Sequence, residues 1–310
     1  MPVTRKDLHG MYKPYLVEAI RLESEVQSLL DQWADVNDDI VKRHTSSTGI
    51  KNIQKLTKEL LETVTEFLKQ YGIIMDVGMA KISDVKAQQV LEESLPLLRA
   101  VGDTTGIEYF KKDMQAFSGV IATRWAAIGV GIYGITFLQR QAALELSTKK
   151  TVNHIITLAN REKLGGQEIQ AILRDYVNPN NVAEKPFDIA RKALDASKKY
   201  VPKDVLAGSV QTNMYEIARN QSSDIWRQLT EEAYDNAEWV EGYDWILSGS
   251  HPKVDICDDL SDESPYPKKS KRPYSHGHCM CDWAAHMRPI AELKDILKDK
   301  GVLYNSKYVK

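Results

Sequence analysis

The chain has 310 residues and a formal charge of −2 at pH 7, because 41 lysines and arginines stand against 43 aspartates and glutamates. This balance excludes a strongly basic chain that would bind nucleic acid or anionic membrane over its whole surface. Apolar residues make up 43% and charged residues 27% of the sequence, which excludes a disordered chain, a collagen-like chain and a disulfide-dense secreted scaffold. At roughly 150 residues per domain, the length predicts about two domains.

Helical periodicity dominates the first hundred residues. Apolar side chains recur every three or four positions from Leu8 to Val41, which predicts a first helix. The polar run His44–Gly49 predicts a turn, after which the same period returns over Ile50–Tyr71 as a second helix. Met75–Ala100 is typical of a third helix, which we expect Pro96 to kink or end.

The most apolar stretch, Phe117–Leu138, predicts a buried helix, because Arg124 leaves an uncharged part too short to cross a bilayer. Within it, Gly129–Gly134 matches G-x-G-x-x-G, the phosphate-binding turn of dinucleotide-binding folds. The rest of the chain lacks the alternating strands of a parallel sheet, so we expect these glycines to allow close helix packing. A nucleotide-binding oxidoreductase that uses residues 129–134 remains an alternative.

Shorter helices are predicted between Lys149 and Lys199, with a loop at Asn178–Pro186, and Lys203–Glu232 is predicted to be one long helix. The residue composition changes near residue 238. Aromatic and β-branched residues in Trp239–Gly249 predict a short strand. The following segment, His251–Pro273, is rich in proline and charge, so we expect its order to come from something other than a hydrophobic core.

The residues that carry chemistry gather in this C-terminal region. Cys257, Cys279 and Cys281 are the only cysteines, and four of the seven histidines lie in the same window. Thiolates and imidazoles are the ligands that zinc prefers in tetrahedral sites. His276, Cys279 and Cys281 can come from one tight turn and Cys257 can close the set, which predicts a Cys3His zinc site. Four protein ligands would make this zinc structural, since a catalytic zinc keeps a position open for water.

Other interpretations of the cluster remain open. Cys257 could form a disulfide with Cys279 or Cys281, the thiols could be free and buried, and His276 and His278 could be ordinary polar loop residues. A zinc hydrolase is the corresponding enzyme alternative. The pattern as a whole predicts a mainly α fold: an elongated multi-helix body and a small irregular or α+β C-terminal module stapled by zinc. The predicted boundaries are 1–148 for an N-terminal helical region, 149–237 for a helical body and 238–310 for the Cys/His module with its basic tail.

The segment from Trp245 to Cys281 resembles the C-terminal signature of phage minor head proteins of the Mu F type. In that family a tryptophan and an Asp-x-Cys element precede an H-P-N-C-R-C-like turn, and the matching stretches here are DWILSGSHPKVDIC and RPYSHGHCMC. His276 falls on the family histidine. Two positions depart from the pattern: Leu260 lies where a second cysteine is frequent, and Met280 replaces an arginine.

The stretches LGGQEIQAILRD, FDIARKAL and VQTNMYEIARNQSSDIWRQL are similar to the helical body of the same family, so the resemblance covers roughly residues 151–287. It implies a structural virion protein rather than an enzyme: a portal-associated minor head protein that acts in capsid assembly and, in some relatives, leaves the head with the DNA. The implied partners are the portal protein and capsid or scaffold proteins. The implied location is the capsid interior or portal vertex, after assembly in the host cytoplasm without a membrane.

A basic run in the C-terminal region offers a further contact. Lys268, Lys269, Lys271 and Arg272 could reach DNA phosphates, because such contacts need only positive charge within range. The alternative is that these side chains pair with the nearby acidic run or are simply solvated.

Overall fold

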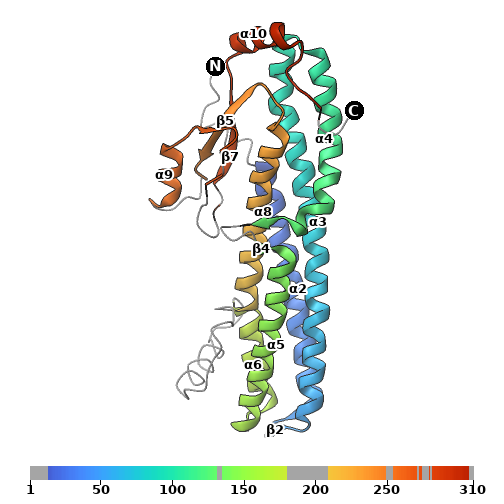
Figure 1. Cartoon of the computed structure of the whole chain (residues 1–310). Helices are drawn as coiled ribbons and strands as arrows, with labels where there is room; N and C mark the ends of the chain where they lie inside the picture. Colours follow the sequence, from blue (N-terminus) through green and yellow to red (C-terminus); the bar gives the residue numbers. More distant parts are fainter. Residues whose placement is uncertain are drawn as a thin grey trace. The chain divides into compact units, whose positions relative to one another are not determined.

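The computed structural model describes residues 13–130, 135–179, 209–248, 254–270, 272–273, 279 and 281–306. Most of these residues are helical, and a small strand-containing region follows near the C-terminus (Figure 1). The helices are α2 (Lys13–His44), α3 (Ile53–Val101), α4 (Thr104–Arg124), α5 (Phe137–Arg161), α6 (Gly166–Val177), α8 (Val210–Tyr234), α9 (Ile256–Asp262) and α10 (Ile290–Lys300). The prediction of a mainly α chain with a small C-terminal α+β region is therefore confirmed.

The strands are short and pair in three antiparallel groups. They are β1 (Thr45–Ser46) with β2 (Gly49–Ile50), β3 (Gly129–Val130) with β4 (Ile135–Thr136), and a three-stranded sheet of β5 (Val240–Ile246), β6 (Tyr266–Pro267) and β7 (Asp282–Met287). A short 3-10 helix spans Trp125–Ala127. The predicted turn at His44–Gly49 is confirmed as the β1–β2 hairpin, in which Gly49 adopts a φ of 146° that glycine tolerates best.

The chain forms two compact units, and both are discontinuous in sequence. Unit 1 consists of Met1–Ile20, Asp76–Phe137 and Arg219–Lys310, and unit 2 consists of Arg21–Met75 and Leu138–Ala218. The predicted divisions follow the chain instead. The boundary at residue 148 lies inside α5, and the boundary at residue 237 lies just after α8. The three-part division by sequence stays a prediction.

Unit 2 is built by the apolar stripes that the sequence periodicity predicted. Its buried side chains come from successive turns of α2, α3, α5 and α6: Leu22, Val26, Leu30, Leu56, Leu60, Val64, Ile155, Ile156, Ile169 and Leu173. One position of the predicted stripe is wrong, because Val36 is 46% exposed and the buried face continues through Asn37 and Val41. Asn37 accepts a hydrogen bond from Thr63 at 3.2 Å, which offsets the cost of burying its amide.

The second and third predicted helices are one helix. α3 runs without interruption from Ile53 to Val101, so the prediction that they are separate is wrong. Pro96 lies inside α3 and does not end it. A proline removes one backbone hydrogen bond, but Val90, Ser94 and Leu98 around it are buried completely, and this packing keeps the helix intact.

The predicted buried helix at residues 117–138 is also wrong as a single element. α4 ends at Arg124, the short 3-10 helix follows, and Gly129–Val130 then pairs with Ile135–Thr136 as antiparallel strands. Trp125 explains the break: its side chain is buried and its indole N–H donates to Asp76 at 2.8 Å. Gly129 thus belongs to a strand pair and not to a helix interface. Residues 131–134 lie outside the described part.

Within unit 1, the residues from Val240 onward fold around an antiparallel sheet in the order β6-β5-β7, and we call residues 238–306 the C-terminal module. Figure 1 shows β5 and β7 side by side. Trp245 lies opposite Trp283 and Tyr243 opposite Ala285. Gly242 lies opposite Pro267, where a Cβ atom would overlap the carbonyl oxygen of Tyr266. The short strand predicted within Trp239–Gly249 is confirmed as β5.

The module has an aromatic core, and the segment His251–Pro273 contributes to it through Tyr266, whose ring centroid lies 5.2 Å from that of Trp283. Tyr243, Trp245 and Trp283 are each at most 2% exposed. Trp283 stacks on Tyr243 with ring centroids 5.1 Å apart and meets Trp245 edge-on at 6.0 Å. Buried aromatic pairs of this kind contribute beyond their area. Any metal ion would therefore add to hydrophobic packing and not replace it.

Tryptophans also pack the module and α8 against other helices of unit 1. Trp239 contacts Phe110 of α4 at 5.0 Å, and Trp226 of α8 contacts Tyr15 of α2 at 4.6 Å. Four tryptophans of this region are buried and so pack inside the protein: Trp226, Trp239, Trp245 and Trp283. In the part of the chain that the structure describes, no helix has the length and apolarity needed to span a bilayer.

Candidate metal centre

Cys257 is placed by the first turn of α9. Asp255 precedes this helix and accepts a hydrogen bond from the Cys257 backbone N–H at 2.7 Å, while Asp258 accepts one from the Asp255 N–H at 2.8 Å. The Asp255 side chain also accepts from the Asp258 backbone N–H, so that Asp255 and Asp258 form a capping box, which fixes where the helix begins. The Asp-x-Cys element of the sequence is therefore a helix start that turns the Cys257 side chain into the interior, where it is completely buried.

Cys279 and Cys281 come from the segment that enters β7. Both are buried, at 4% and 3% exposure. The Cys281 N–H points at the Cys279 sulfur with an N···Sγ distance of 3.4 Å, and the Ser248 N–H points at the Cys281 sulfur at 3.5 Å. Both amides lie where they would also hydrogen-bond a thiolate, so they favour the anionic form that a metal requires.

The three sulfur atoms meet although 22 residues separate Cys257 from Cys279. The Cys257 and Cys279 sulfurs are 3.5 Å apart, and all three lie within 4.8 Å of one another. None is in a disulfide, so this structure does not contain the predicted disulfide alternative. Three buried thiols at this spacing can hold a metal ion, which confirms that Cys257, Cys279 and Cys281 belong together.

The surroundings raise the pKa of two of these thiols. Burial, followed by the neighbouring Cys279, raises the pKa of Cys257 to about 12. The hydrogen bond with Cys279, followed by burial, raises the pKa of Cys281. Without a cation these groups are therefore neutral thiols near pH 7. A bound divalent cation would have to displace their protons to gain thiolate ligands.

Arg227 of α8 is the residue at this site that the sequence analysis missed. Its guanidinium donates to the carbonyl oxygens of Cys279 and Cys281 at 2.8–3.0 Å, and it pairs with Asp224 at 3.0 Å. A second buried row on α8 could have indicated it, since Ser223, Arg227, Thr230 and Tyr234 repeat at helical spacing. That row is polar at three positions, so a search for apolar periodicity does not find it.

The histidines are not brought to the sulfur atoms in the described residues. His276, the predicted fourth ligand, and His278 lie outside the described residues. His286 lies on β7, where its Nδ1 is 2.9 Å from Asp244 and its Nε2 is 3.5 Å from Glu241. Among the described residues, the group that could hold a metal ion is accordingly formed by three cysteines.

Two members of the basic run are engaged within the protein. Lys268 donates to the carbonyl oxygen of Ala237 at 2.6 Å, and burial lowers its pKa. Arg272 lies 3.9 Å from Glu231 and donates to the carbonyl oxygen of Asp224 at 3.4 Å. Lys269 is exposed, and Lys271 lies outside the described residues. Lys268 and Arg272 thus contact α8 and the chain after it rather than the acidic run at 258–263.

Glu231 lies near the C-terminal end of α8, 3.9 Å from Arg272. Burial raises its pKa, and Arg272 opposes this effect. The carboxylate faces Trp283 of the module core as well as Arg272. Glu231 is therefore a partly buried acid next to the module.

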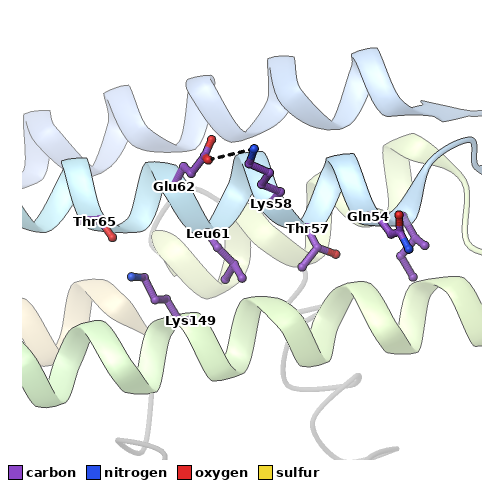
Figure 2. Close-up of a pocket in the computed structure, with 8 residues that line it drawn as sticks. Gln54, Thr57, Lys58, Leu61, Glu62, Thr65 and Lys149 are labelled. Carbon is purple, nitrogen blue, oxygen red and sulfur yellow. Dashed lines mark ion pairs between the residues drawn. The ribbon is translucent and has the colours of Figure 1, made fainter.

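A separate open groove lies in unit 2 between α3 and α5 (Figure 2). Its volume is about 660 Å³, and its lining residues are Ile53, Gln54, Thr57, Lys58, Leu61, Glu62, Thr65 and Lys149. Both lysines have anionic partners: Lys58 lies 3.8 Å from Glu62, and Lys149 lies 2.7 Å from Glu145. The same Lys149 bond, followed by one from Thr65, lowers the pKa of Glu145. The groove is shallow and its charges are paired, so the thiol cluster is the stronger candidate site.

Comparison of the chain with protein-family models, with curated proteins and with solved structures finds no match.

Proposed function

We propose that this chain is a structural, non-enzymatic virion protein: a portal-associated minor head protein of the Mu F type, whose C-terminal module is stapled by a zinc ion. One observation carries the proposal. The signature residues Cys257, Cys279 and Cys281, which are far apart in the sequence, converge in one buried cluster on a module that packs against α8. A rigid knob of this kind suits docking on a large assembly.

The chemistry of the donor set favours zinc with a structural role. Tetrahedral zinc with Zn–S bonds of about 2.3 Å separates its sulfur ligands by about 3.8 Å, close to the 3.5 Å between Cys257 and Cys279. All three thiols are at most 4% exposed. A catalytic zinc must admit water and substrate, which such burial disfavours. His276 is the ligand that we propose for the fourth position.

The portal protein is the proposed main partner, with capsid or scaffold proteins as further contacts in the head. Of the basic run, Lys269 is the described member whose exposure suits a weak contact with packaged DNA. The proposed location is the capsid interior or the portal vertex, reached after assembly in the host cytoplasm. Ejection with the DNA is a further property that the resemblance implies.

Co-expression with the portal protein of the same genome tests the proposal. The full chain should co-sediment with the portal ring on a density gradient, and the variant Cys257→Ser/Cys279→Ser should co-sediment less because its module is loosened. A ring that sediments alone, while the zinc-loaded chain remains folded in the upper fractions, would contradict the assignment.

A further inference from the structure

Arg227 lies beside the candidate metal centre without being a ligand. It is only 3% exposed and comes from α8, whereas the thiols come from α9 and the segment before β7. Its Nη2 donates to the carbonyl oxygens of Cys279 at 2.9 Å and of Cys281 at 2.8 Å, and its Nε donates to that of Cys281 at 3.0 Å. The planar guanidinium thus holds the backbone of two of the three clustered cysteines.

The guanidinium is itself held in place from two directions. Nη1 pairs with Asp224, one turn earlier on α8, at 3.0 Å. The indole of Trp245 lies 5.1 Å from the guanidinium carbon, a cation–π contact. Trp245 belongs to β5, opposite Trp283 of β7. Arg227 therefore has little freedom, and the position of the Cys-x-Cys backbone follows the position of α8.

Arg227 would therefore hold the ligand residues of a metal site in place without contacting the ion itself. Groups that hold metal ligands in place before the ion binds reduce the conformational entropy that these ligands lose on binding. They also keep the ligand atoms at the required spacing. A lysine could not replace the fork, because its single ammonium group cannot span two carbonyls in a fixed plane. A positive charge beside thiolate ligands also favours the anionic set.

We infer that Arg227 is the positioning residue of the metal centre and couples occupancy of the three-cysteine site to the packing of α8 against the module. The inference rests on the proposed zinc site. Because linkage is reciprocal, an ion that tightens the Cys279–Cys281 segment tightens α8, and loss of the Arg227 fork weakens the ion. Occupancy of the metal site then depends on how tightly the module packs against α8, and not only on the local fold of the Cys279–Cys281 segment.

The variants Arg227→Met and Arg227→Lys test this inference in the full-length chain. Competition with a chromophoric chelator should show that Arg227→Met binds zinc about 10–100-fold more weakly than the wild type, with Arg227→Lys in between. Arg288→Met is the matched control, since Arg288 donates to the carbonyl oxygen of Glu238 in the same module without contacting the cysteines. It should bind zinc as the wild type does.

A merely structural role for Arg227 gives a different result. The variants would then melt at a lower temperature by the same amount with and without zinc, and their zinc affinity would equal that of the wild type. Equal affinity in Arg227→Lys and the wild type overturns the inference, even where Arg227→Met does not fold.

Hydrogen exchange on the unmodified chain provides a test that needs no variant. Zinc should slow the exchange of the backbone amides of residues 223–234, and a chelator should reverse the effect. Unchanged exchange in a chain that demonstrably holds zinc overturns the coupling and leaves the proposed centre standing. A wild-type chain that binds no zinc rejects the centre itself, and the inference with it.

Discussion

Unit 2 and the C-terminal module are held together in different ways. Unit 2 is helical, and aliphatic side chains such as Val26, Leu60 and Leu173, repeating every three or four residues, form its core. The module is a small sheet with two short helices, and it combines an aromatic core with three buried thiols. Periodic apolar surface is sufficient for the first region. The second has little such surface, so a few large side chains and the proposed metal ion determine its stability.

The aromatic core of the module gives the largest expected effect. Trp283→Ala removes a completely buried indole that contacts Tyr243, Trp245 and Tyr266. We expect a loss of about 3–5 kcal/mol in the free energy of unfolding, because the cavity cannot be refilled. Denaturant titration measures it. Leu146→Ala, at an exposed leucine of α5, is the control and should change stability by less than about 0.5 kcal/mol. Similar values for the two variants would show that the module has no core of its own.

Metal removal sharpens the same comparison. With free zinc at about one hundred times its dissociation constant, binding should raise the free energy of unfolding by about 2.7 kcal/mol. Cys279→Ser should abolish this gain, because it removes one ligand of the buried set. Thermal melts with zinc, with magnesium and with a chelator measure the gain. Magnesium prefers oxygen ligands and should have no effect. A gain that persists in Cys279→Ser would place the ion elsewhere.

A buried hydrogen bond in unit 2 should contribute less to the free energy of unfolding than Trp283 or zinc binding does. The Tyr71 hydroxyl, completely buried on α3, donates to the carbonyl oxygen of Met214 at 3.0 Å. Tyr71→Phe should cost about 1 kcal/mol, since the carbonyl loses this donor. The cost should be the same with zinc and with a chelator. A zinc-dependent cost would mean that the metal centre influences unit 2 as well. Tyr109→Phe, on the exposed face of α4, is the control.

The smallest expected effect is the pH dependence due to Glu231. Burial raises its pKa in the folded chain above the ordinary value of 4.5, so the folded state holds this proton more tightly than the unfolded state. The resulting stabilisation is complete below about pH 4.5 and decreases as the pH rises through the folded pKa. In Glu231→Gln the melting temperature should therefore fall less steeply than in the wild type as the pH is raised above about 4.5. An unchanged slope between the two chains would mean that another acid is responsible.

Much of this difference between the regions could be predicted from the sequence. Helical spacing predicts the buried faces of α2 and the first half of α3, and aromatic and β-branched residues predict β5. Clustering of cysteines in one window predicts that Cys257, Cys279 and Cys281 meet. Each of these signals is local or depends on residue types that are rare in the chain.

The remaining features depend on contacts between segments far apart in sequence. A proline usually ends a helix, yet α3 continues through Pro96 because the nearby side chains of Val90 and Leu98 are completely buried. Trp125 breaks an apolar run because its indole N–H donates a hydrogen bond to Asp76. Arg227 joins the thiol site only because the fold brings α8 to a segment about fifty residues later. The spacing of residues within a single helix or strand cannot predict such a contact.

Elemental analysis of the purified full-length chain tests the central claim most directly. After dialysis against zinc and then against metal-free buffer, the wild type should retain one zinc ion per chain, and Cys257→Ser/Cys279→Ser/Cys281→Ser should retain almost none. A wild-type chain that keeps no metal, or a triple variant that keeps as much as the wild type, would contradict the assignment of the three cysteines as a metal centre.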